Sequence, residues 1–232
     1  MKLKFGVKEV VATGIGTALF IVLTNAQIPF GIIPNTALQS RVAVLTFFSA
    51  VFGPIVGGAI GLIGHALGDA IFYGSIYWSW VFPDALFGIL MGVFAAKFAI
   101  KDGGFDGKAI ALFNVVQVIA NALAWILLAP VLDILIYAEP AKKVFTQGIL
   151  AFIGNIIVAA VLGTLLAFAY SKIGAKSSSL SKEDEYLVTV HDDGRPEPLP
   201  YLIKYRMMRI LTYIICFYLH HPAFSEGLRA LI

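Results

Sequence analysis

Cysteine and charged residues are both scarce in this chain. Cys216 is the single cysteine among 232 residues. One cysteine excludes a disulfide within the chain, and it excludes zinc or iron–sulfur sites built from several cysteines. Charged residues make up 13% of the chain, whereas a soluble domain has about 25%. The formal net charge of +3, with no stripe of basic residues, argues against a nucleic-acid partner.

Several motifs that would indicate catalysis are also missing. The sequence has no G-x-x-x-x-G-K-[ST], so the chain does not hydrolyse ATP with a P-loop. It has no H-E-x-x-H and no G-x-S-x-G. Only one histidine lies within the apolar runs, and no ladder of acidic residues crosses them. We therefore expect no metal, no cofactor and no enzymatic activity.

Hydrophobic residues, in contrast, dominate the chain. They make up 59% of it, and the mean hydropathy is +0.86. These values are typical of an all-α membrane protein. The sequence predicts six membrane-spanning helices, at residues 7–26, 41–52, 55–73, 80–100, 109–131 and 146–170. Residues 1–176 would form this six-helix domain. Residues 177–232 would form a polar linker and a tail that is either an interfacial helix or disordered.

The distribution of basic residues predicts how the helices are oriented. Nine lysines lie at one set of helix ends: Lys2, Lys4, Lys8, Lys97, Lys101, Lys108, Lys172, Lys176 and Lys182. Three basic residues lie at the opposite set: Arg41, Lys142 and Lys143. Because basic residues accumulate on the cytoplasmic side, both termini of the bundle are expected in the cytoplasm.

The stretch from residue 53 to residue 84 carries the most informative polar residues. His65 and Asp69 are one helical turn apart in an apolar, glycine-rich run, and Tyr73 continues their face. An aromatic loop follows with Trp78 and Trp80, and then comes Asp84. Ionisable groups inside a membrane are costly, so they usually mark a functional site.

Other polar residues are expected at the same depth as this stretch. Asn114, Gln117, Asn121 and Trp125 follow helical spacing and form one stripe, whose last two members reach the level of His65. The first loop would add Asn35, Gln39 and Arg41 from above. Such convergence predicts a pocket for a small, flat, polar molecule. The tryptophans also fit interfacial anchors, the amides fit contacts between helices, and His65 with Asp69 fits a structural pair.

The first predicted helix contains small residues at a spacing that permits close helix packing. Ala12 and Gly16 form one small-xxx-small pair, and Gly14 and Ala18 form a second. Small residues at this spacing let another helix approach closely. The spacing fits packing within the bundle, and it also fits an interface with a partner.

These features together resemble a known family. The IPNT sequence of the first loop and the run FGPIVGGAIGLIGHALGDAIFYGSIYWSW resemble the substrate-binding (S) component of an energy-coupling factor (ECF) transporter. The likeness covers roughly residues 4–182. The branch it resembles is associated with vitamins or vitamin precursors such as hydroxymethylpyrimidine or riboflavin.

The resemblance implies a role in uptake across a bacterial cell membrane. Such a subunit binds a vitamin from outside and associates with a transmembrane coupling subunit and two ABC ATPases. ATP hydrolysis by these partners then reorients it. Residues 27–40 and 73–79 would help to close the pocket, and Ala12 and Gly16, with Gly14 and Ala18 beside them, would contact the coupling subunit.

The substrate and two other functions stay open at this stage. A hydroxymethylpyrimidine-like heterocycle is the favoured substrate, with riboflavin, pyridoxine and pantothenate as alternatives. The chain could instead be an intramembrane enzyme that uses His65 and Asp69 as an acid–base pair, or a structural subunit without a ligand.

Overall fold

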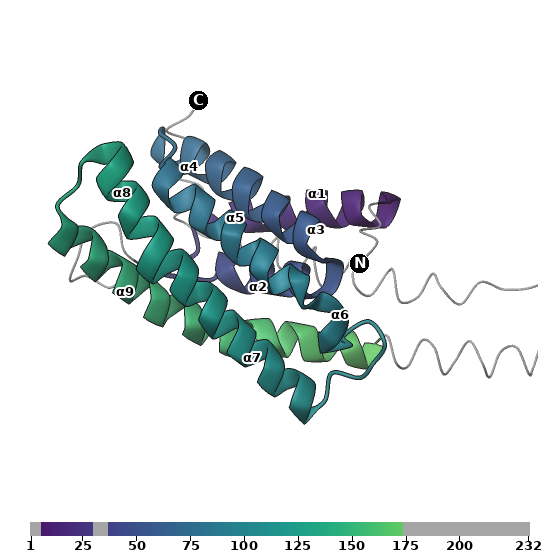
Figure 1. Cartoon of the computed structure of the whole chain (residues 1–232). Helices are drawn as coiled ribbons and strands as arrows, with labels where there is room; N and C mark the ends of the chain where they lie inside the picture. The colour runs from purple at the N-terminus through teal and green to yellow at the C-terminus, as the bar shows by residue number, and fades with distance from the viewer. Residues whose placement is uncertain (1–5, 30–36, 174–232) are drawn as a thin grey trace, which may run out of the picture. The chain divides into compact units, whose positions relative to one another are not determined.

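A computed structural model describes residues 6–29 and 37–173 of the chain. The described residues are mostly helical, and their helices lie alongside one another as a bundle (Figure 1). Three of the sequence predictions lie outside the described residues: the role of Asn35, the domain boundary at residue 176, and the nature of the tail.

The first half of the bundle is punctuated by Pro and Gly. Its helices and strands are α1 (Val7–Thr24), β1 (Gln27–Pro29), β2 (Ala37–Gln39), α2 (Arg41–Phe52), α3 (Pro54–Ala59), the π-helical η1 (Ile60–Gly64), α4 (His65–Tyr73), α5 (Trp78–Val93) and α6 (Ala95–Phe98). Gly53, with φ of 98°, separates α2 from α3, and Pro54 begins α3, where its missing N–H costs nothing. Gly74, with φ of 72°, ends α4 in the left-handed conformation.

Two long helical runs make up the second half. The first joins α7 (Gly107–Asn121), η2 (Ala122–Leu128) and α8 (Ala129–Tyr137), and the second joins α9 (Ala141–Val158) to η3 (Ala159–Gly163) and continues to Ile173. The side chain of Asp106 caps the start of α7 by accepting from the backbone N–H groups of Lys108 and Ala109. The π-helical segments η1, η2 and η3 lie inside longer helices, as such segments often do at functional sites.

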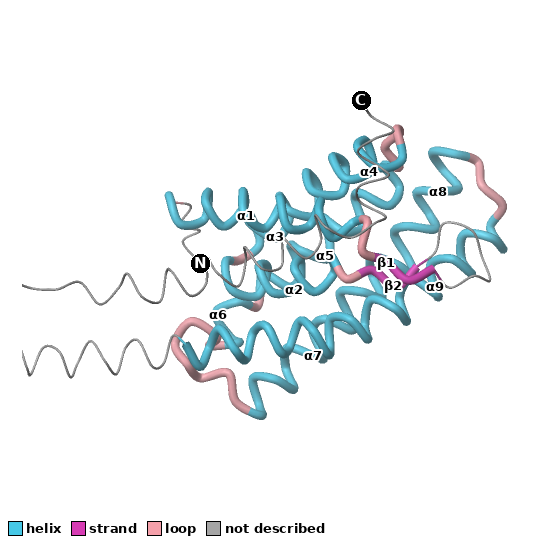
Figure 2. Tube along the Cα trace, turned by 180° about the vertical axis from the view of Figure 1, so that it is seen from behind, coloured by secondary structure: helices cyan, strands magenta, loops and turns pink. Residues whose placement is uncertain are grey.

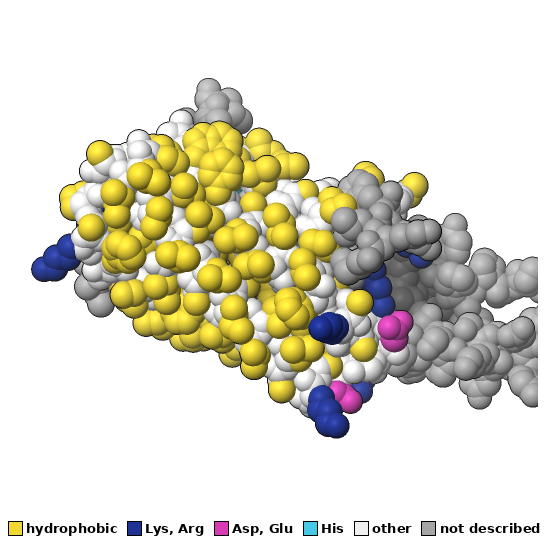
Figure 3. Space-filling model, viewed as in Figure 1, with side chains coloured by type: hydrophobic (Ala, Val, Ile, Leu, Met, Phe, Trp, Pro, Cys, Tyr) yellow, Lys and Arg dark blue, Asp and Glu magenta, His cyan; other side chains and the backbone are white. Residues whose placement is uncertain are grey.

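The described residues include four helical runs long and apolar enough to span a membrane: Val7–Thr24, Pro54–Tyr73, Gly107–Tyr137 and Ala141–Ile173. Arg41–Phe52 and Trp78–Val93 are shorter apolar helices. On the face shown in Figure 3, hydrophobic side chains form a broad surface and the basic side chains lie toward its ends. Exposed Val115, Leu127 and Leu165 are among the large apolar side chains on the two long runs. This arrangement fits an all-α membrane protein, because apolar side chains can face lipid.

The predicted fourth helix, residues 80–100, is divided into α5, which ends at Val93, and the short α6, which ends at Phe98. Two further boundaries are wrong for one shared reason. The fifth helix was expected to end at residue 131, but it continues as α8 to Tyr137. The sixth was expected to begin at residue 146, but α9 begins at Ala141. In both cases a few charged residues in an apolar run were interpreted as a loop, although helical backbone bonds tolerate such side chains where they are buried or exposed to water.

The predicted first loop contains a small hairpin-like pairing. β1 and β2 pair antiparallel, with Gln27 opposite Gln39 and Pro29 opposite Ala37 (Figure 2). The hydroxyl of Ser40 also donates to the carbonyl of Ala26 at 2.7 Å. The two ends of the loop are therefore held together where α1 leads into α2.

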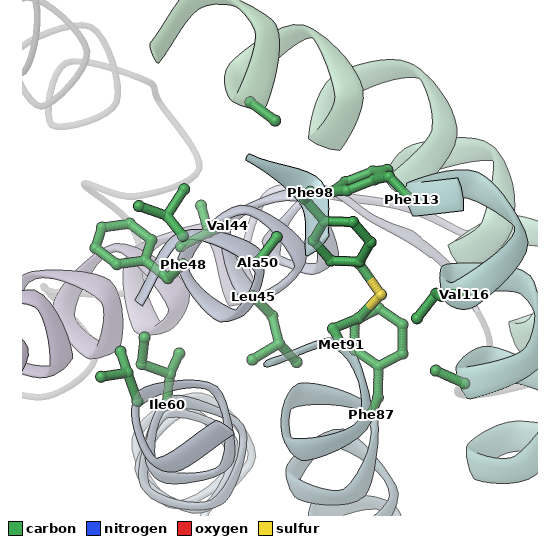
Figure 4. Close-up of a cluster of buried hydrophobic side chains, with 14 of the residues drawn as sticks. Val44, Leu45, Phe48, Ala50, Ile60, Phe87, Met91, Phe98, Phe113 and Val116 are labelled. Atoms are coloured by element: carbon green, nitrogen blue, oxygen red, sulfur yellow. The ribbon is translucent and has the colours of Figure 1, made fainter. Parts of the chain in front are cut away.

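The core is built from aromatic and aliphatic side chains of many helices. Leu45, Ile60, Phe87, Met91 and Phe113 are fully buried and lie close together (Figure 4). They come from α2, η1, α5 and α7. This core fixes the four segments around the polar residues described next.

Candidate functional site

Glycines set the distance between α3–η1 and α5. A Cβ atom at Gly57 would lie 2.4 Å from the carbonyl oxygen of Gly88, and one at Gly61 would lie 2.4 Å from that of Asp84. The backbone of α5 can come this close because Gly57 and Gly61 have no side chain on the face that meets it. Because Asp84 lies directly against Gly61, its side chain reaches the histidine that begins α4.

The same glycine-rich run packs closely against α1. A Cβ atom at Gly64 would lie 3.0 Å from the ring of Phe20, and one at Gly68 would lie 2.8 Å from Oγ1 of Thr24. The ring of Phe20 also lies 6.1 Å from the His65 ring, centroid to centroid. Residues from α1, α4 and α5 therefore meet around His65.

His65 is the centre of a buried group of ionisable side chains. Its Nδ1 lies 2.8 Å from Oδ2 of Asp84, and its Nε2 lies 3.4 Å from Oδ1 of Asp69. The contact with Asp84 has the length of a hydrogen bond but is not aligned as one. All three side chains are buried. We call these residues, together with Arg41, the ion cluster.

Arg41 completes the ion cluster from the start of α2. Its Nη2 lies 3.1 Å from Nε2 of His65, its Nη1 donates to Oγ1 of Thr24 at 3.2 Å, and its Nε donates to Oε1 of Gln39. Because a guanidinium only donates hydrogen bonds, we assign Nε2 of His65 as the acceptor and the ring proton to Nδ1, which faces Asp84. The guanidinium carbon also lies 4.9 Å from the centre of the Phe20 ring.

The ion cluster is connected to both predicted gating loops. Oδ2 of Asp69 accepts from the backbone N–H of Tyr77 at 3.1 Å. On the other side, Arg41 holds Gln39 of β2, and the amide of Gln27 donates to the hydroxyl of Tyr73 at 2.9 Å. The residues between α4 and α5 are thus tied to the same cluster as the strands that follow α1.

A second polar group forms where α5 begins. Asp133 of α8 is 5% exposed, and both of its carboxylate oxygens accept hydrogen bonds. Oδ1 accepts from the hydroxyl of Ser79, and Oδ2 accepts from the indole Nε1 of Trp80 at 2.9 Å. The ring of Trp80 lies 5.4 Å from that of Trp125, at 60°. We call Ser79, Trp80, Trp125 and Asp133 the tryptophan cluster.

Asp133 is not among the predicted site residues, because the sequence predicts a loop between residues 131 and 146, whereas the structure places Asp133 in α8. A signal was nevertheless present. Steps of four residues lead from Asn121 through Trp125 and Ala129 to Asp133 and Tyr137, which continues the predicted polar stripe. A charged residue on the polar stripe of a helix can face the interior of the bundle. The helical spacing of Asp133 therefore predicts its position better than its charge does.

Asn121 precedes Trp125 of the tryptophan cluster by four residues, and its side chain has a hydrogen-bond acceptor without a partner. Its Nδ2 donates to the side-chain oxygen and the carbonyl oxygen of Gln117, each at 3.0 Å, and Gln117 donates to the carbonyl of Ile156 at 3.4 Å. Oδ1 of Asn121 is buried without a partner, and the side chain is fully buried. A buried acceptor without a partner is costly, so this atom is a candidate to meet a ligand.

Asn114 lies two turns earlier on α7, and its Oδ1 is also buried without a partner, but its amide nitrogen bonds to another helix. Its Nδ2 donates to Oγ1 of Thr164 at 3.2 Å and to the carbonyl of Ile110 at 3.0 Å. The first bond joins two long helices, as amides commonly do inside membrane bundles.

The structure thus divides the predicted substrate-binding residues into groups. Gln39, Arg41, His65, Asp69 and Asp84 belong to the ion cluster or contact it, and Trp80 and Trp125 belong to the tryptophan cluster, with Asn121 one turn before Trp125. Tyr73, the last residue of α4, is 51% exposed, and Trp78, the first residue of α5, is 42% exposed. The prediction of convergence from several segments therefore leads to two neighbouring polar groups, and α5 contributes to both.

The small residues of α1 fall on two faces. Ala12 and Gly16 are buried, and a Cβ atom at Gly16 would lie 2.3 Å from Ile60 of η1. Gly14 and Ala18 are exposed, and a Cβ atom at Gly14 would have nothing within 4 Å. The first pair packs within the chain, and the second pair faces outward.

Within residues 6–29 and 37–173, no three His, Cys, Asp or Glu side chains are grouped so that they could hold a metal ion.

Comparison with known proteins gives consistent matches. The family described as ECF-type riboflavin transporter, S component, matches residues 4–172. A UPF0397 protein of Exiguobacterium sp. is 50% identical over 180 residues, which cover 77% of this chain and 98% of that protein. A UPF0397 protein of Streptococcus gordonii is 49% identical over 179 residues, covering 77% of this chain and 96% of the relative. One of Streptococcus pneumoniae is 45% identical over 183 residues, covering 79% and 100%. No solved structure matches the chain.

Proposed function

Because the chain belongs to the family of ECF-type riboflavin transporter S components, we propose that it captures a vitamin or vitamin precursor from outside the cell and delivers it inward. The family is one of membrane transporter subunits, not enzymes. The finer parts of the proposal are the substrate, the position of its site, the orientation of the bundle and the partners.

One observation carries the proposed site: a buried amide oxygen without a partner belongs to the residue one helical turn before Trp125, whose ring packs against that of Trp80. The atom is Oδ1 of Asn121, and the rings are those of Trp80 and Trp125. Indole faces stack well on flat heterocycles, and a free amide oxygen accepts a hydrogen bond from a ring N–H or amino group. A small site of this mixed character suits a vitamin-sized ligand.

A hydroxymethylpyrimidine-like heterocycle is the substrate we favour. Its flat ring would stack against an indole, and its amino group would donate to Asn121. Riboflavin, which appears in the name of the family, offers a larger flat ring with an N–H donor. Pyridoxine has a smaller aromatic ring, and pantothenate has none, so pantothenate would use only the polar contacts.

The ion cluster has a supporting role in this proposal. Each nitrogen of the Arg41 guanidinium contacts Gln39, Thr24 or His65. A ligand would have to break these contacts to bind there. We therefore assign the cluster to holding α1, α2, α4 and α5 together, with its opposite charges close enough to limit the cost of burial.

The proposed orientation is supported by the helix ends that lie together. Nζ of Lys101 lies 4.9 Å from the centre of the Phe52 ring, and the backbone N–H of Phe105 donates to Ser171 at 3.4 Å. The end of α2, the turn before α7 and the end of the last helix are thus grouped, and Lys97, Lys101, Lys108 and Lys172 belong to this group. We propose that this end is cytoplasmic and that the tryptophan cluster lies toward the outside.

Transport would depend on partners that supply ATP hydrolysis. These partners would be one transmembrane coupling subunit and two ABC ATPases, which would reorient the chain in the bilayer. The outward face of α1 is the candidate contact for the coupling subunit. Its exposed residues include Gly14 and Ala18 beside Val11 and Ile15. Small side chains on such a face allow a partner helix to approach closely.

The substrate proposal can be tested on the purified full-length chain. Small molecules carried through purification would be identified by mass spectrometry, and hydroxymethylpyrimidine, riboflavin, pyridoxine and pantothenate would be titrated calorimetrically. We expect tight, saturable binding of hydroxymethylpyrimidine. Preferential binding of another of the four compounds would replace the favoured substrate. A protein that carries no small molecule and binds none of the four would contradict the proposed function.

A further inference from the structure

Asp133 is a buried carboxylate that no part of the proposed function uses. Both of its oxygens are occupied, one by the hydroxyl of Ser79 and the other by the indole N–H of Trp80. Its donors come from α5, whereas Asp133 itself lies on α8, 53 positions further along the chain than Trp80. The carboxylate therefore joins two helices through the edge of a tryptophan ring.

The start of α5 suits a carboxylate at this place. The N-cap residue, Tyr77, makes no side-chain capping bond, and the first turn contains no acidic residue of its own. The first residues of a helix have free backbone N–H groups and a partial positive charge, which favour a nearby negative charge. Asp133 lies against this first turn, because Ser79 and Trp80 are its second and third residues.

Tyr137, one turn after Asp133, reinforces the contact. Its hydroxyl accepts from the backbone N–H of Trp78 at 3.1 Å, and its ring lies 5.6 Å from the ring of Tyr77. One face of α8 therefore contacts four consecutive residues at the start of α5, from Tyr77 to Trp80. A single hydrogen bond would let the indole rotate about its side-chain bonds. This set of contacts fixes both the helix and the ring.

We propose that Asp133 is a positioning residue that fixes the indole of Trp80 at the angle to Trp125 needed to receive the substrate. The inference rests on the proposed function, in which these two rings stack on the vitamin. An indole held in place before binding loses less side-chain freedom when the ligand arrives, so affinity rises. Asp133 acts here through Trp80 and does not touch the substrate.

A ligand-free experiment tests the positioning itself. The chain has three tryptophans, so Trp78→Phe leaves only the Trp80–Trp125 pair. The near-ultraviolet circular dichroism of this pair is the difference between the W78F protein and the W78F/W80F protein. The same difference is then measured with Asp133→Leu present in both proteins, and we expect most of the signal to be lost. We expect Asp133→Asn to preserve it, because an amide oxygen can accept from the indole while the amide nitrogen donates to Ser79.

Two results of this experiment would overturn the inference. One is an unchanged tryptophan-pair signal in the W78F/D133L protein, and the other is an equal loss in the W78F/D133N protein. If D133L does not fold, ultraviolet resonance Raman spectroscopy of the W78F protein decides instead, because one indole band reports hydrogen bonding at N–H. A spectrum with only unbonded indoles would contradict the contact between Trp80 and Asp133.

A double-mutant cycle then connects positioning to binding. The probe is hydroxymethylpyrimidine or riboflavin, whichever the unmodified chain binds. We expect Asp133→Ala to weaken binding about tenfold, and to change it less than about twofold when Trp80 is already Phe, since residues that act together are not additive. Equal effects in both backgrounds would mean that Asp133 only stabilises the fold. If neither probe binds the unmodified chain, the substrate proposal fails, while the ligand-free spectra still decide the role of Asp133.

Discussion

Nδ1 of His65 lies 2.8 Å from Oδ2 of Asp84, and this contact joins the start of α4 to α5 inside the bundle. Both side chains are buried, at 2% and 1% exposure. Arg41 lies on the opposite edge of the imidazole, so the ring is held between a cation and an anion. The pair depends on the close backbone approach at Gly61, which brings α5 within reach.

We predict that Asp84→Ala lowers the free energy of unfolding by about 3–5 kcal/mol, because it removes the anion facing Nδ1 of His65 and leaves the buried charge of Arg41 opposed by Asp69 without Asp84. Thermal unfolding of the purified chain in detergent measures the change. The matched control is Glu139→Ala, which removes an ion pair with Lys143 of the same 2.8 Å length.

The control pair differs in its exposure to water. The side chains of Lys143 and Glu139 are 48% and 34% exposed, and exposed pairs of this spacing contribute about 0.3–0.5 kcal/mol. If Asp84→Ala and Glu139→Ala shifted the unfolding temperature equally, the ion cluster would not have the stabilising role assigned to it.

A second prediction concerns the glycine contact between α3 and α5. A Cβ atom at Gly88 would lie 2.3 Å from the carbonyl oxygen of Gly57, which is backbone and has little freedom to move. Gly88→Ala should therefore sharply reduce the yield of monodisperse protein in size-exclusion chromatography. Gly14→Ala makes the same chemical change where nothing lies within 4 Å, so it should leave the yield unchanged or raise stability by up to about 1 kcal/mol. Similar profiles for the two variants would contradict the packing.

Parts of the fold could be predicted because their signals are local. The bounds predicted for the second helix, residues 41–52, are confirmed by α2, since Gly53 and Pro54 mark its end in any context. The i, i+4 spacing of His65 and Asp69 also predicted correctly that they share a face.

Other parts depend on contacts between distant segments. The approach of His65 to Asp84 requires two glycine faces to meet, and a single sequence does not say which glycines pair. The pairing of β1 with β2 depends on where α1 and α2 place the ends of the loop. The charge of Asp133 favours a loop when the sequence is considered alone, and its burial in α8 is explained only by the donors from α5.

A third prediction concerns assembly with the coupling subunit. Gly14→Leu and Ala18→Leu should each reduce co-purification with the coupling module, because both positions are on the exposed face of α1. They should leave substrate binding by the isolated chain unchanged. Ala111→Leu, at an exposed position on α7, is the control and should assemble normally. Gly16→Leu should instead disturb the chain itself, because a side chain there would meet Ile60.

The outcome separates two assignments for α1. Normal co-purification of both the Gly14 and the Ala18 variants would remove the outward face from the interface. A Gly16→Leu protein that is folded, binds substrate and fails only in assembly would place the contact on the face that is buried here, and would require α1 to rotate or separate from η1 when the partner binds.

The last prediction concerns the unpartnered oxygen of Asn121. Replacing Asn121 with Leu keeps a similar volume but removes the acceptor, so a ligand that donates to it should bind about tenfold or more weakly, since a hydrogen-bonding group of the ligand would be buried without a partner. Calorimetric titration with hydroxymethylpyrimidine measures the effect. Asn114→Leu is the control from the same helix: it breaks the bond to Thr164 and should lower stability without a comparable change in affinity.

The same two variants also distinguish a ligand site from a packing defect. Each variant removes a buried unpartnered acceptor from the ligand-free protein. Asn121→Leu also breaks the bonds from Nδ2 to Gln117, and Asn114→Leu also breaks the bond to Thr164. If Oδ1 of Asn121 binds the ligand, Asn121→Leu should lower the affinity more than Asn114→Leu does. The loss of stability in Asn121→Leu should not exceed that in Asn114→Leu. If instead the two variants lose stability alike and both bind with normal affinity, Oδ1 of Asn121 has no part in recognition, and the substrate must be sought elsewhere around the tryptophan cluster.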